Sequence, residues 1–460
     1  MSRNRRNSML SRRGGALGFV AVLAILSAVV TSSVARAMEG QDAKPVDHVQ
    51  GRPLKVFILV GQSNMQGQAQ ETTLAGLTMD PETKPLYDKL VDENGKPRVH
   101  QNVYIAAFSR TDGWGKIGDA VEKHGQLTVG YGGNTTEAGK LGPELGFGVT
   151  MYEHVKEPIL LIKTSWGGKS LMLDFRPPSG GPYYAHPEEV KDRTTNKGET
   201  IKAADEIAQK EAAKGHYYRL MLEHVRSVLA DPGKYCPAYD PKAGYEIAGF
   251  AWFQGFNDLV GPYPPADPND NKKGTSKDYA EYSRLLACFI RDVRKDLSAP
   301  NMPFAIGVLG VGGKNAGENT ELFRKAMAAP AEMEEFKGNV AAVDTADFWD
   351  EKLGELEERK SVTRPQKGRQ ASEDKYAALR EKVASLQKEL EALEEQKGKD
   401  RDRKKMEELK QKIQELLYSP EELEYIAKNR SNQGYHYLAR IIHRSGLSRS
   451  CEGFCEGIYG

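Results

Sequence analysis

The chain has 460 residues, which is enough for one large α/β domain or two ordinary domains with a sizeable hydrophobic core. Its 65 Lys and Arg residues balance 64 Asp and Glu residues, and the formal net charge at pH 7 is +1. This balance gives no global field of the kind that attracts nucleic acid or a polyanionic surface, so we expect no nucleic-acid partner.

The N-terminus has the pattern of an export signal. A basic segment with five arginines precedes an apolar run at 16–34, and Ala-Arg-Ala at 35–37 supplies a small-x-small cleavage site. We therefore expect residues 1–37 to be a signal peptide, followed by a polar lead-in at 38–54. The mature protein would be periplasmic or extracellular, without a membrane anchor. The alternative is an uncleaved anchor, because the apolar run approaches the length of a spanning helix.

Six short apolar runs predict β-strands. They lie at 55–60, 102–108, 158–164, 246–253, 303–309 and 339–343. Apolar residues at helical spacing predict helices between them, at 143–155, 201–229 with an interruption near Gly215, 279–297 and 320–336. The stretch from the end of the first strand to about 101 and the stretch 113–139 are rich in turn residues and are predicted to be loops. Strands that alternate with helices favour a mostly parallel sheet covered on both faces, which is a three-layer α/β/α sandwich of the flavodoxin-like type.

The stretch 355–417 differs from the rest, because Glu, Lys, Arg, Leu and Gln dominate it. Its apolar residues form two seams with alternating steps of four and three, namely Leu379, Val383, Leu386, Leu390 and Leu393, then Met406, Leu409, Ile413 and Leu416. We predict a helical hairpin with an antiparallel coiled-coil seam, inserted into the α/β domain as an arm that contacts a partner or a second copy. A single long helix or a partly disordered charged tract is the alternative.

The first domain would thus run over 55–354 and resume at 418–447, with short helices at 420–429 and 435–443. A tail at 448–460 holds two of the four cysteines, Cys451 and Cys455. An even count of cysteines in an exported protein permits one or two disulfides, and the pair in the tail is the better candidate. Cys236 and Cys288 are the other two.

A serine follows the first predicted strand at the point where open α/β sheets bind ligands. Ser63 comes two residues after Gly61, which breaks the apolar run 55–60. The alternative is local, since Ser63 or Asn64 would also serve as a helix N-cap. The later strands run into Trp-Gly-Gly at 166–168 and into the polar block 254–258.

Other kinds of site are not supported by the sequence. The Gly-Lys-Ser at 168–170 has Lys163 where a phosphate-binding loop needs glycine. Neither H-E-x-x-H nor G-x-S-x-G occurs, so a metal-dependent hydrolase and a lipase-type α/β-hydrolase are disfavoured. We expect no metal and no other cofactor.

A serine nucleophile needs a base within hydrogen-bond reach and donors for the oxyanion. Suitable donors are the Ser63 amide, a glycine from the middle of the chain and the Asn257 side chain. His436, between two tyrosines late in the chain, is the natural base.

These blocks resemble the SGNH hydrolases in their carbohydrate-esterase branch, the sialate O-acetylesterase-like or acetylxylan esterase-type domain. The matching blocks are GQSNM at 61–65, LGPELGFG at 141–148, Trp-Gly-Gly at 166–168, WFQGFND at 252–258 and SNQGYHYL at 431–438. They occur in the family's order and span roughly 55–350 plus 431–443.

The resemblance implies a role for each matching residue. Ser63 would be the nucleophile and His436 the general base, while Gly142 and Asn257 would join the Ser63 amide as oxyanion donors. Side chains expected to shape the substrate pocket are Gln62, Asn64, Gln254 and Trp166, with Trp252 also able to stack on a sugar. A role in the core or in satisfying turn backbone is the alternative for these side chains.

One position departs from the family pattern. The family carries an acid three residues before the histidine, and here that residue is Gln433. Either His436 works without an acid, in a dyad, or an acid from elsewhere orients it. The candidates are Asp258, Asp344 and Asp347.

The sequence therefore predicts an exported esterase that removes acetyl groups from O-acetylated carbohydrate through an acyl-serine intermediate. Two alternatives stay open. One is a non-catalytic carbohydrate-binding or scaffold protein that works through the arm at 355–417, and the other is a broader aryl or lipid esterase.

Overall fold

The computed structural model describes residues 51–429, apart from 80, 82, 111–119, 134–138, 186–189, 196–197, 264–276, 364–374 and 396–401. The predicted signal peptide, the helix expected at 435–443, His436, Cys451 and Cys455 lie outside the described residues. Within these bounds, none of the helices has the length and apolar character needed to cross a membrane.

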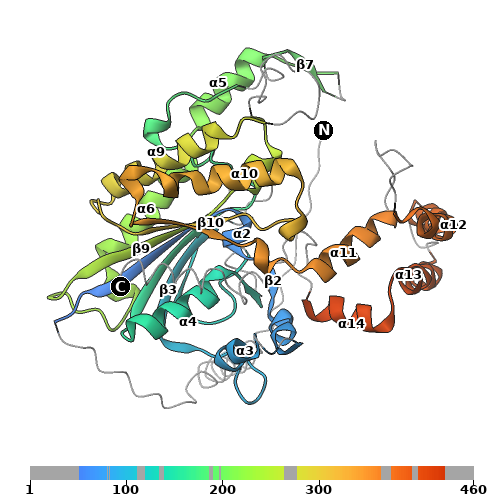
Figure 1. The fold of residues 1–460 in the computed structure, drawn as a ribbon, viewed down its shortest axis with the longest axis horizontal. Coiled ribbons are helices and arrows are strands. Elements are labelled where there is room, and N and C mark those ends of the chain that lie inside the picture. The colour runs from blue at the N-terminus through green and yellow to red at the C-terminus, as the bar shows by residue number, and fades with distance from the viewer. Residues whose placement is uncertain are drawn as a thin grey trace, which may run out of the picture. The chain divides into compact units, whose positions relative to one another are not determined.

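A seven-stranded sheet forms the centre of the described chain (Figure 1). Its strands, in spatial order, are β11 (Val340–Asp344), β10 (Phe304–Val308), β9 (Tyr245–Phe253), β1 (Leu54–Gly61), β6 (Ile159–Ser165), β3 (His100–Arg110) and β4 (Ala120–Leu127). The first six are parallel, and β4 pairs antiparallel with β3 at the edge. All six predicted strands are present.

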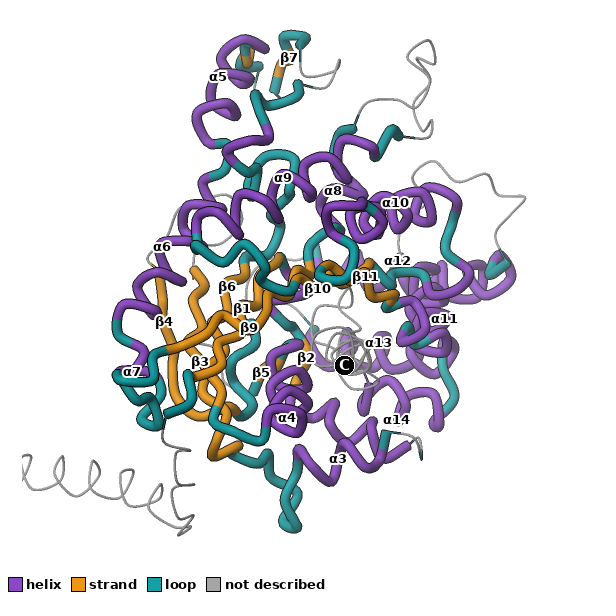
Figure 2. Tube along the Cα trace, turned by 60° about the vertical axis from the view of Figure 1, so that its left-hand side comes forward, coloured by secondary structure: helices purple, strands orange, loops and turns teal. Residues whose placement is uncertain are grey.

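Helices cover both faces of the sheet (Figure 2). Alternate residues of β1 pack into the two layers. Val56, Ile58 and Val60 pack in one apolar core and Phe57 and Leu59 in the other. The first core includes α6 (His216–Ala230), α9 (Ala280–Asp296) and α10 (Glu318–Ala328), and the second includes α3 (Lys84–Leu90), the 3-10 segment η1 (Glu71–Met79) and α4 (Pro143–Val155). The predicted three-layer α/β/α sandwich is confirmed.

Smaller elements complete the α/β domain. They are α2 (Ser63–Gln66), α5 (Ala203–Ala213), α7 (Pro232–Tyr235) and α8 (Phe256–Val260), with the two-stranded pairs β2 (Ala69–Gln70) with β5 (Lys140–Leu141) and β7 (Arg193–Thr194) with β8 (Thr200–Ile201). The predicted break at Gly215 is confirmed, since this residue has φ of +64° and separates α5 from α6. Such a backbone conformation suits glycine.

Three sequence-based expectations were wrong in detail. The stretch 113–139, predicted as loop, contains β4, and the loop-rich stretch before 101 contains α3 and η1. The helix predicted at 320–336 ends at Ala328 and continues as short 3-10 turns, because Pro330 cannot donate to an α-helical ladder.

The arm predicted at 355–417 holds part of α11 (Glu351–Lys360) and all of α12 (Ala377–Glu394) and α13 (Arg403–Leu417), and α14 (Pro420–Asn429) follows it. An apolar seam of its own joins α12 to α13, made of Val383, Leu390, Met406, Leu409, Ile413 and Leu417. An ion pair of 2.6 Å joins Lys405, near the start of α13, to Glu389, near the end of α12, so the two helices run antiparallel. Leu416, predicted in the seam, is 41% exposed and Leu417 replaces it. Leu409, Ile413 and Leu417 follow one another at intervals of four residues, which places them on one face of a straight helix.

A second apolar cluster holds the base of the arm, where α11 meets α14. Tyr425 donates its hydroxyl to the buried carboxylate of Asp350, which also caps the start of α11. Arg359 donates to the carboxylate of Glu422. At the end of α14, buried Asn429 packs against Gly76 of η1, where an added Cβ would lie 2.4 Å from its Oδ1 atom.

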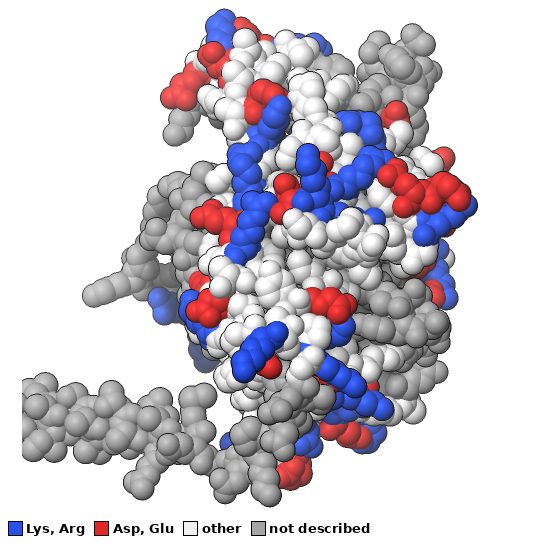
Figure 3. All heavy atoms as spheres, turned by 90° about the vertical axis from the view of Figure 1, so that its left-hand side faces the viewer, with Lys and Arg blue, Asp and Glu red and all other residues white. Residues whose placement is uncertain are grey.

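The surface carries both signs of charge. Figure 3 shows Lys and Arg side chains interspersed with Asp and Glu on the face that it presents. Several of the basic groups on α6 and α9 are paired, as Arg226 is with Asp296 and Arg284 with Glu281. This mixture agrees with the near-zero net charge.

The cysteines in the described part of the chain form no disulfide. Cys236 and Cys288 are both free and buried. Burial raises the pKa of the Cys236 thiol to about 11, so this cysteine is a structural residue rather than a nucleophile.

We expect stability to fall on mild acidification because of a buried histidine. His224 stacks on Phe108, and its Nδ1 lies 3.6 Å from the Glu122 carboxylate. Burial lowers the pKa of His224 to about 4, although the carbonyl of Ala106 and the charge of Glu122 oppose the shift and Lys234 adds to it. Below the ordinary pKa of about 6.5 the unfolded chain takes up a proton that the folded chain does not. The contribution of neutral His224 to the free energy of unfolding is therefore fully present above this pH. It falls by about 3 kcal/mol as the pH drops towards 4.

Urea unfolding at pH 7, 5.5 and 4.5 measures this loss, and His224→Phe should make the dependence shallower. A residual slope is expected from His100, whose pKa burial also lowers to about 4. If the free energy of unfolding depends on pH as steeply in His224→Phe as in the wild-type protein, His224 is protonated in the folded protein.

Candidate active site

The site is built at the carboxyl ends of β1, β6 and β9. In the parallel register Gly61 lies opposite Ser165 on one side and Phe253 on the other, so the residues that follow all three strands come together. Gly61 is needed at this point, because an added Cβ would lie 2.2 Å from the carbonyl oxygen of Phe253. The chain then turns into α2, whose first residue is the half-buried Ser63.

Gln62 connects the serine to the block after β9. Its buried side-chain amide donates to the Oδ1 atom of Asn257 at 2.9 Å and approaches the Oγ atom of Ser63 at 3.4 Å. Its Oε1 atom accepts from Gln254 and from the amides of Gly255 and Asn257. Gln62 is completely buried, so it holds the site together instead of contacting substrate as the sequence suggested.

Asn257 is held in one orientation by these bonds. Because its Oδ1 atom accepts from Gln62 and its own backbone amide donates to Gln62, the side-chain NH₂ group is left as the donor for another acceptor. The residue lies in the first turn of α8 and is half-buried. This is the arrangement that an oxyanion donor beside Ser63 requires.

Gly167 is the glycine that lies next to Ser63. A Cβ built on Gly167 would be 3.8 Å from the Cβ of Ser63 and 3.1 Å from Oε1 of Gln66. Within the described residues, no hydrogen bond engages the amides of Gly167 and Gly168. The two glycines of the Trp-Gly-Gly block had no role in the sequence analysis, and the adjacency of β6 to β1 brings Gly167 beside Ser63.

Gly142, predicted as an oxyanion donor, is engaged elsewhere. Its amide donates to the Oε1 atom of buried Glu144 at 2.8 Å, which leaves no proton for an oxyanion. Gly142 instead provides room for Gly67, since a Cβ on Gly67 would lie 2.1 Å from the Cα of Gly142. The prediction was wrong because the carboxylate that takes the amide belongs to the first turn of the helix α4.

Asp258 is a structural carboxylate and is corrected as a candidate acid. It is 1% exposed and accepts from the amides of Leu171 and Met172 and from the hydroxyl of Tyr263. Burial raises its pKa, and these bonds oppose the shift. Gln254, also predicted to contact substrate, is 1% exposed and donates to Asp258 and to the carbonyl of Lys169.

The two other candidate acids lie at the end of β11. Asp344 accepts from the amide of Ala346 at 2.8 Å. Asp347 is 61% exposed and pairs with Lys314 at 3.0 Å. Since His436 and Gln433 lie outside the described residues, neither acid is placed relative to the predicted base.

The tryptophans belong to the core and do not offer a face to a sugar. Trp166 is 3% exposed and its ring contacts those of Phe108, Phe175 and Tyr217. Trp252 is 1% exposed. Both rings thus have the core role that the sequence left open as the alternative, whereas a substrate contact by the half-buried Asn64 stays a prediction.

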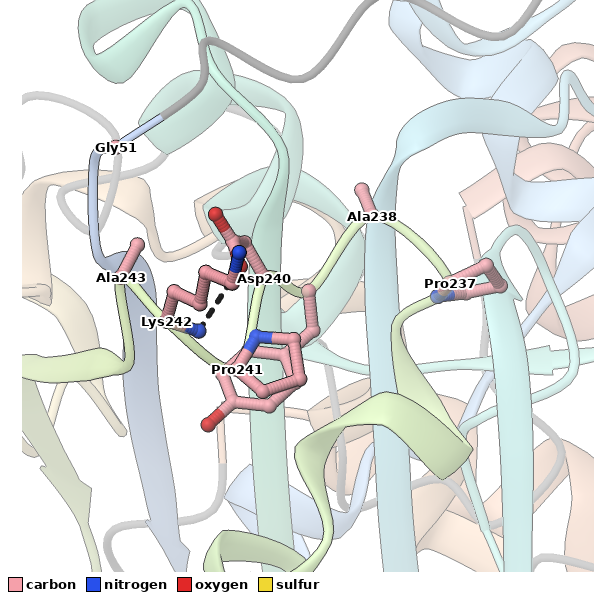
Figure 4. A pocket seen from close by; sticks show the side chains of 8 residues that line it. Gly51, Pro237, Ala238, Asp240, Pro241, Lys242 and Ala243 are labelled. Carbon is pink, nitrogen blue, oxygen red and sulfur yellow. Dashed lines mark hydrogen bonds between the residues drawn. The ribbon is translucent and has the colours of Figure 1, made fainter.

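A surface hollow of about 790 Å³ lies at the opposite end of the sheet (Figure 4). Gly51 and the residues 237–243 line it, just before the starts of β1 and β9. The Asp240 carboxylate accepts from the backbone amide of Lys242. Ligands of parallel sheets bind at the carboxyl ends of strands, so the Ser63 site is the better candidate. No group of three or more metal-ligating side chains occurs among the described residues.

A protein-family model matches the part of the chain that forms this site. The model of the family described as carbohydrate esterase, sialic acid-specific acetylesterase, matches residues 53–353, about two thirds of the chain. The chain belongs to this family of carbohydrate esterases. The match includes Ser63 and Asn257 and ends before the arm and His436.

Several solved structures are similar at low identity. They include a protein from Arabidopsis thaliana (17% identity, 64% of this chain and 86% of that one, TM-score 0.33), XAC1771, a carbohydrate acetylesterase from Xanthomonas citri (13%, 64% and 51%, TM-score 0.34), and NanS (15%, 65% and 79%, TM-score 0.36). The chain thus spans about half the length of XAC1771. Comparison with curated proteins gave no match.

Proposed function

We propose that this carbohydrate esterase is an exported serine esterase that removes O-acetyl groups from acetylated polysaccharide or sialic acid. The observation that carries the proposal is the link through Gln62, which places Ser63 and Asn257 together at the ends of adjacent parallel strands. Membership of the carbohydrate esterase family supports the ester class of substrate.

In the proposed reaction, the Oγ atom of Ser63 attacks the carbonyl carbon of the acetyl ester while His436 takes its proton. The oxyanion accepts from the Ser63 amide, the Gly167 amide and the Asn257 side chain. The sugar hydroxyl leaves with the proton from His436, and an acetyl-serine remains. Water activated by His436 then releases acetate and restores Ser63.

The test uses the mature protein with two assays in parallel. Acetate release is measured from O-acetylated sialic acid, acetylxylan and acetylated pectin, with aryl butyrates for comparison. A serine-directed phosphonate then labels the protein, and peptide mass spectrometry locates the adduct. We expect acetate from at least one acetylated glycan and an adduct at Ser63.

Each other outcome favours one of the alternatives. An adduct at Ser63 with cleavage of aryl esters alone indicates a broader esterase. If the protein gives no adduct and releases no acetate, it is a non-catalytic carbohydrate-binding protein.

A further inference from the structure

A completely buried ion pair lies beneath the turn that carries Ser63. The Nζ atom of Lys163 in β6 is 2.6 Å from the Oε2 atom of Glu144 in α4, and their side chains are 2% and 0% exposed. Neither residue has a role in the reaction proposed above.

The pair is connected to four segments of the chain. Lys163 also donates to the backbone carbonyls of Gln66 at 3.1 Å and Tyr131 at 2.8 Å, so all three ammonium protons have acceptors. The second oxygen of Glu144 accepts from the amide of Gly142. β6, the end of α2, the 131–133 turn and the start of α4 therefore meet at this one pair.

The carbonyl of Gln66 ends the short helix that Ser63 begins. Within α2, the described backbone bonds run from the Gln66 amide to the Gln62 carbonyl and from the Gly67 amide to the Ser63 carbonyl. A single helical turn is not stable by itself, so contacts from outside fix its direction. Those contacts are the Lys163 ammonium and the amide of Gly133, which donates to the carbonyls of Gln66 and Gly67.

Stability alone does not account for such a pair. Burial lowers the pKa of Lys163, and the neighbouring Glu144 opposes the shift. Taking two charges out of water costs free energy, and an apolar pair of similar volume is often as stable. The geometry that the charges impose on the Ser63 turn is what an apolar pair would lack.

We propose that Lys163 and Glu144 are positioning residues for the nucleophile, acting through the Gln66 carbonyl and the 131–133 and 142 turns. The proposal rests on the proposed function, since it assumes that Ser63 reacts. The pair touches neither substrate nor reacting atoms. It sets the distance between Ser63 and the donors on the neighbouring strand ends.

The test replaces both charges together with Lys163→Met and Glu144→Met, which avoids leaving one buried charge without a partner. We expect kcat for acetate release to fall by at least about tenfold, because small misplacements of a nucleophile have large effects on rate. KM should stay within about twofold. The melting temperature should fall modestly, because the Gly142 amide and the Tyr131 carbonyl lose buried partners, so kcat is measured well below it. The rate of phosphonate labelling at Ser63 should fall by the same factor as kcat.

Arg294→Met is the matched control. Arg294 is a buried cation that donates to the carbonyls of Met302 and Asn339, before the starts of β10 and β11 and away from the carboxyl ends of the sheet. It should lower the melting temperature and leave kcat unchanged. If the double methionine variant does not fold, Lys163→Gln with Glu144→Gln keeps polar groups in place, and a fall in kcat of about threefold at constant KM is expected.

An unchanged kcat in a folded double variant would overturn the proposal. A loss of kcat that only follows a loss of melting temperature would also overturn it, since that is the result of a merely structural pair. These outcomes differ from failure of the proposed function, in which the wild-type protein itself neither releases acetate nor takes the label.

Discussion

Ser63→Ala is expected to reduce kcat for acetate release by about 10⁴-fold or more, to a residual rate that stays above the rate without enzyme. Removing the nucleophile of a serine hydrolase eliminates the acyl-enzyme route, and only the smaller acceleration that the oxyanion donors and substrate binding supply remains. The fold should not change, because the described hydrogen bonds of α2 use the backbone of Ser63 and its hydroxyl makes one long contact with Gln62. Initial rates at saturating acetylated glycan, together with thermal unfolding, measure both quantities.

Ser170→Ala is the matched control for this experiment. Ser170 is half-buried in the loop that follows Gly167, and its hydroxyl contacts Asp174 and accepts from the amide of Leu173. Its replacement should cost stability and at most a small factor in rate. Residual activity of Ser63→Ala within tenfold of wild type would identify a nucleophile elsewhere in the chain.

The sheet was predictable because its buried strands are short apolar runs bounded by glycines and prolines. β1 and β6 are buried along nearly their whole length, which leaves a strong signal in the sequence. β4 was missed because it pairs on one side only and carries Glu122, Lys123 and His124 in succession. An edge strand exposed to water has no continuous apolar run, so its composition resembles that of a loop.

The sequence blocks that form the site could be predicted, but the contacts between their residues could not. Ser63 and Asn257 follow strands that proved to be neighbours, and the family resemblance of their sequence blocks was what paired them. The glycine that lies beside Ser63 could not be identified in the same way. Whether Gly142 or Gly167 lies beside Ser63 depends on which strand neighbours β1, and the sequence does not state strand order.

Buried polar residues were the hardest to interpret. Gln62 and Gln254 were predicted as substrate-binding groups and Asp258 as a candidate orienting acid, yet their side chains are buried and bond to one another and to neighbouring backbone. Their chemistry is the same in both roles, because a buried amide or carboxylate needs hydrogen-bond partners whether these come from protein or from substrate. Burial decides between the two roles, and burial is a property of the fold.

Asn257→Ala is expected to lower kcat by about 10²- to 10³-fold with little change in KM. Removal of one side-chain donor from an oxyanion hole has an effect of this size, because the donor acts on charge that develops only in the transition state. The backbone amide of Asn257 would still donate to Gln62, so the turn should stay in place. The substitution therefore removes the donor without removing its support.

Asn257→Asp provides a sharper version of the same test. The side chains have nearly the same shape, but an ionised carboxylate cannot donate and would place negative charge beside the oxyanion. We expect a loss of kcat at least as large as that of the alanine variant. Asn102→Ala is the control, since that amide donates to the hydroxyl of Tyr152 near the start of β3, at the other end of the sheet, and its loss should leave kcat unchanged. If both variants at 257 keep wild-type kcat, the oxyanion is stabilised by backbone amides alone, and the link through Gln62 serves only to hold β1 and β9 together.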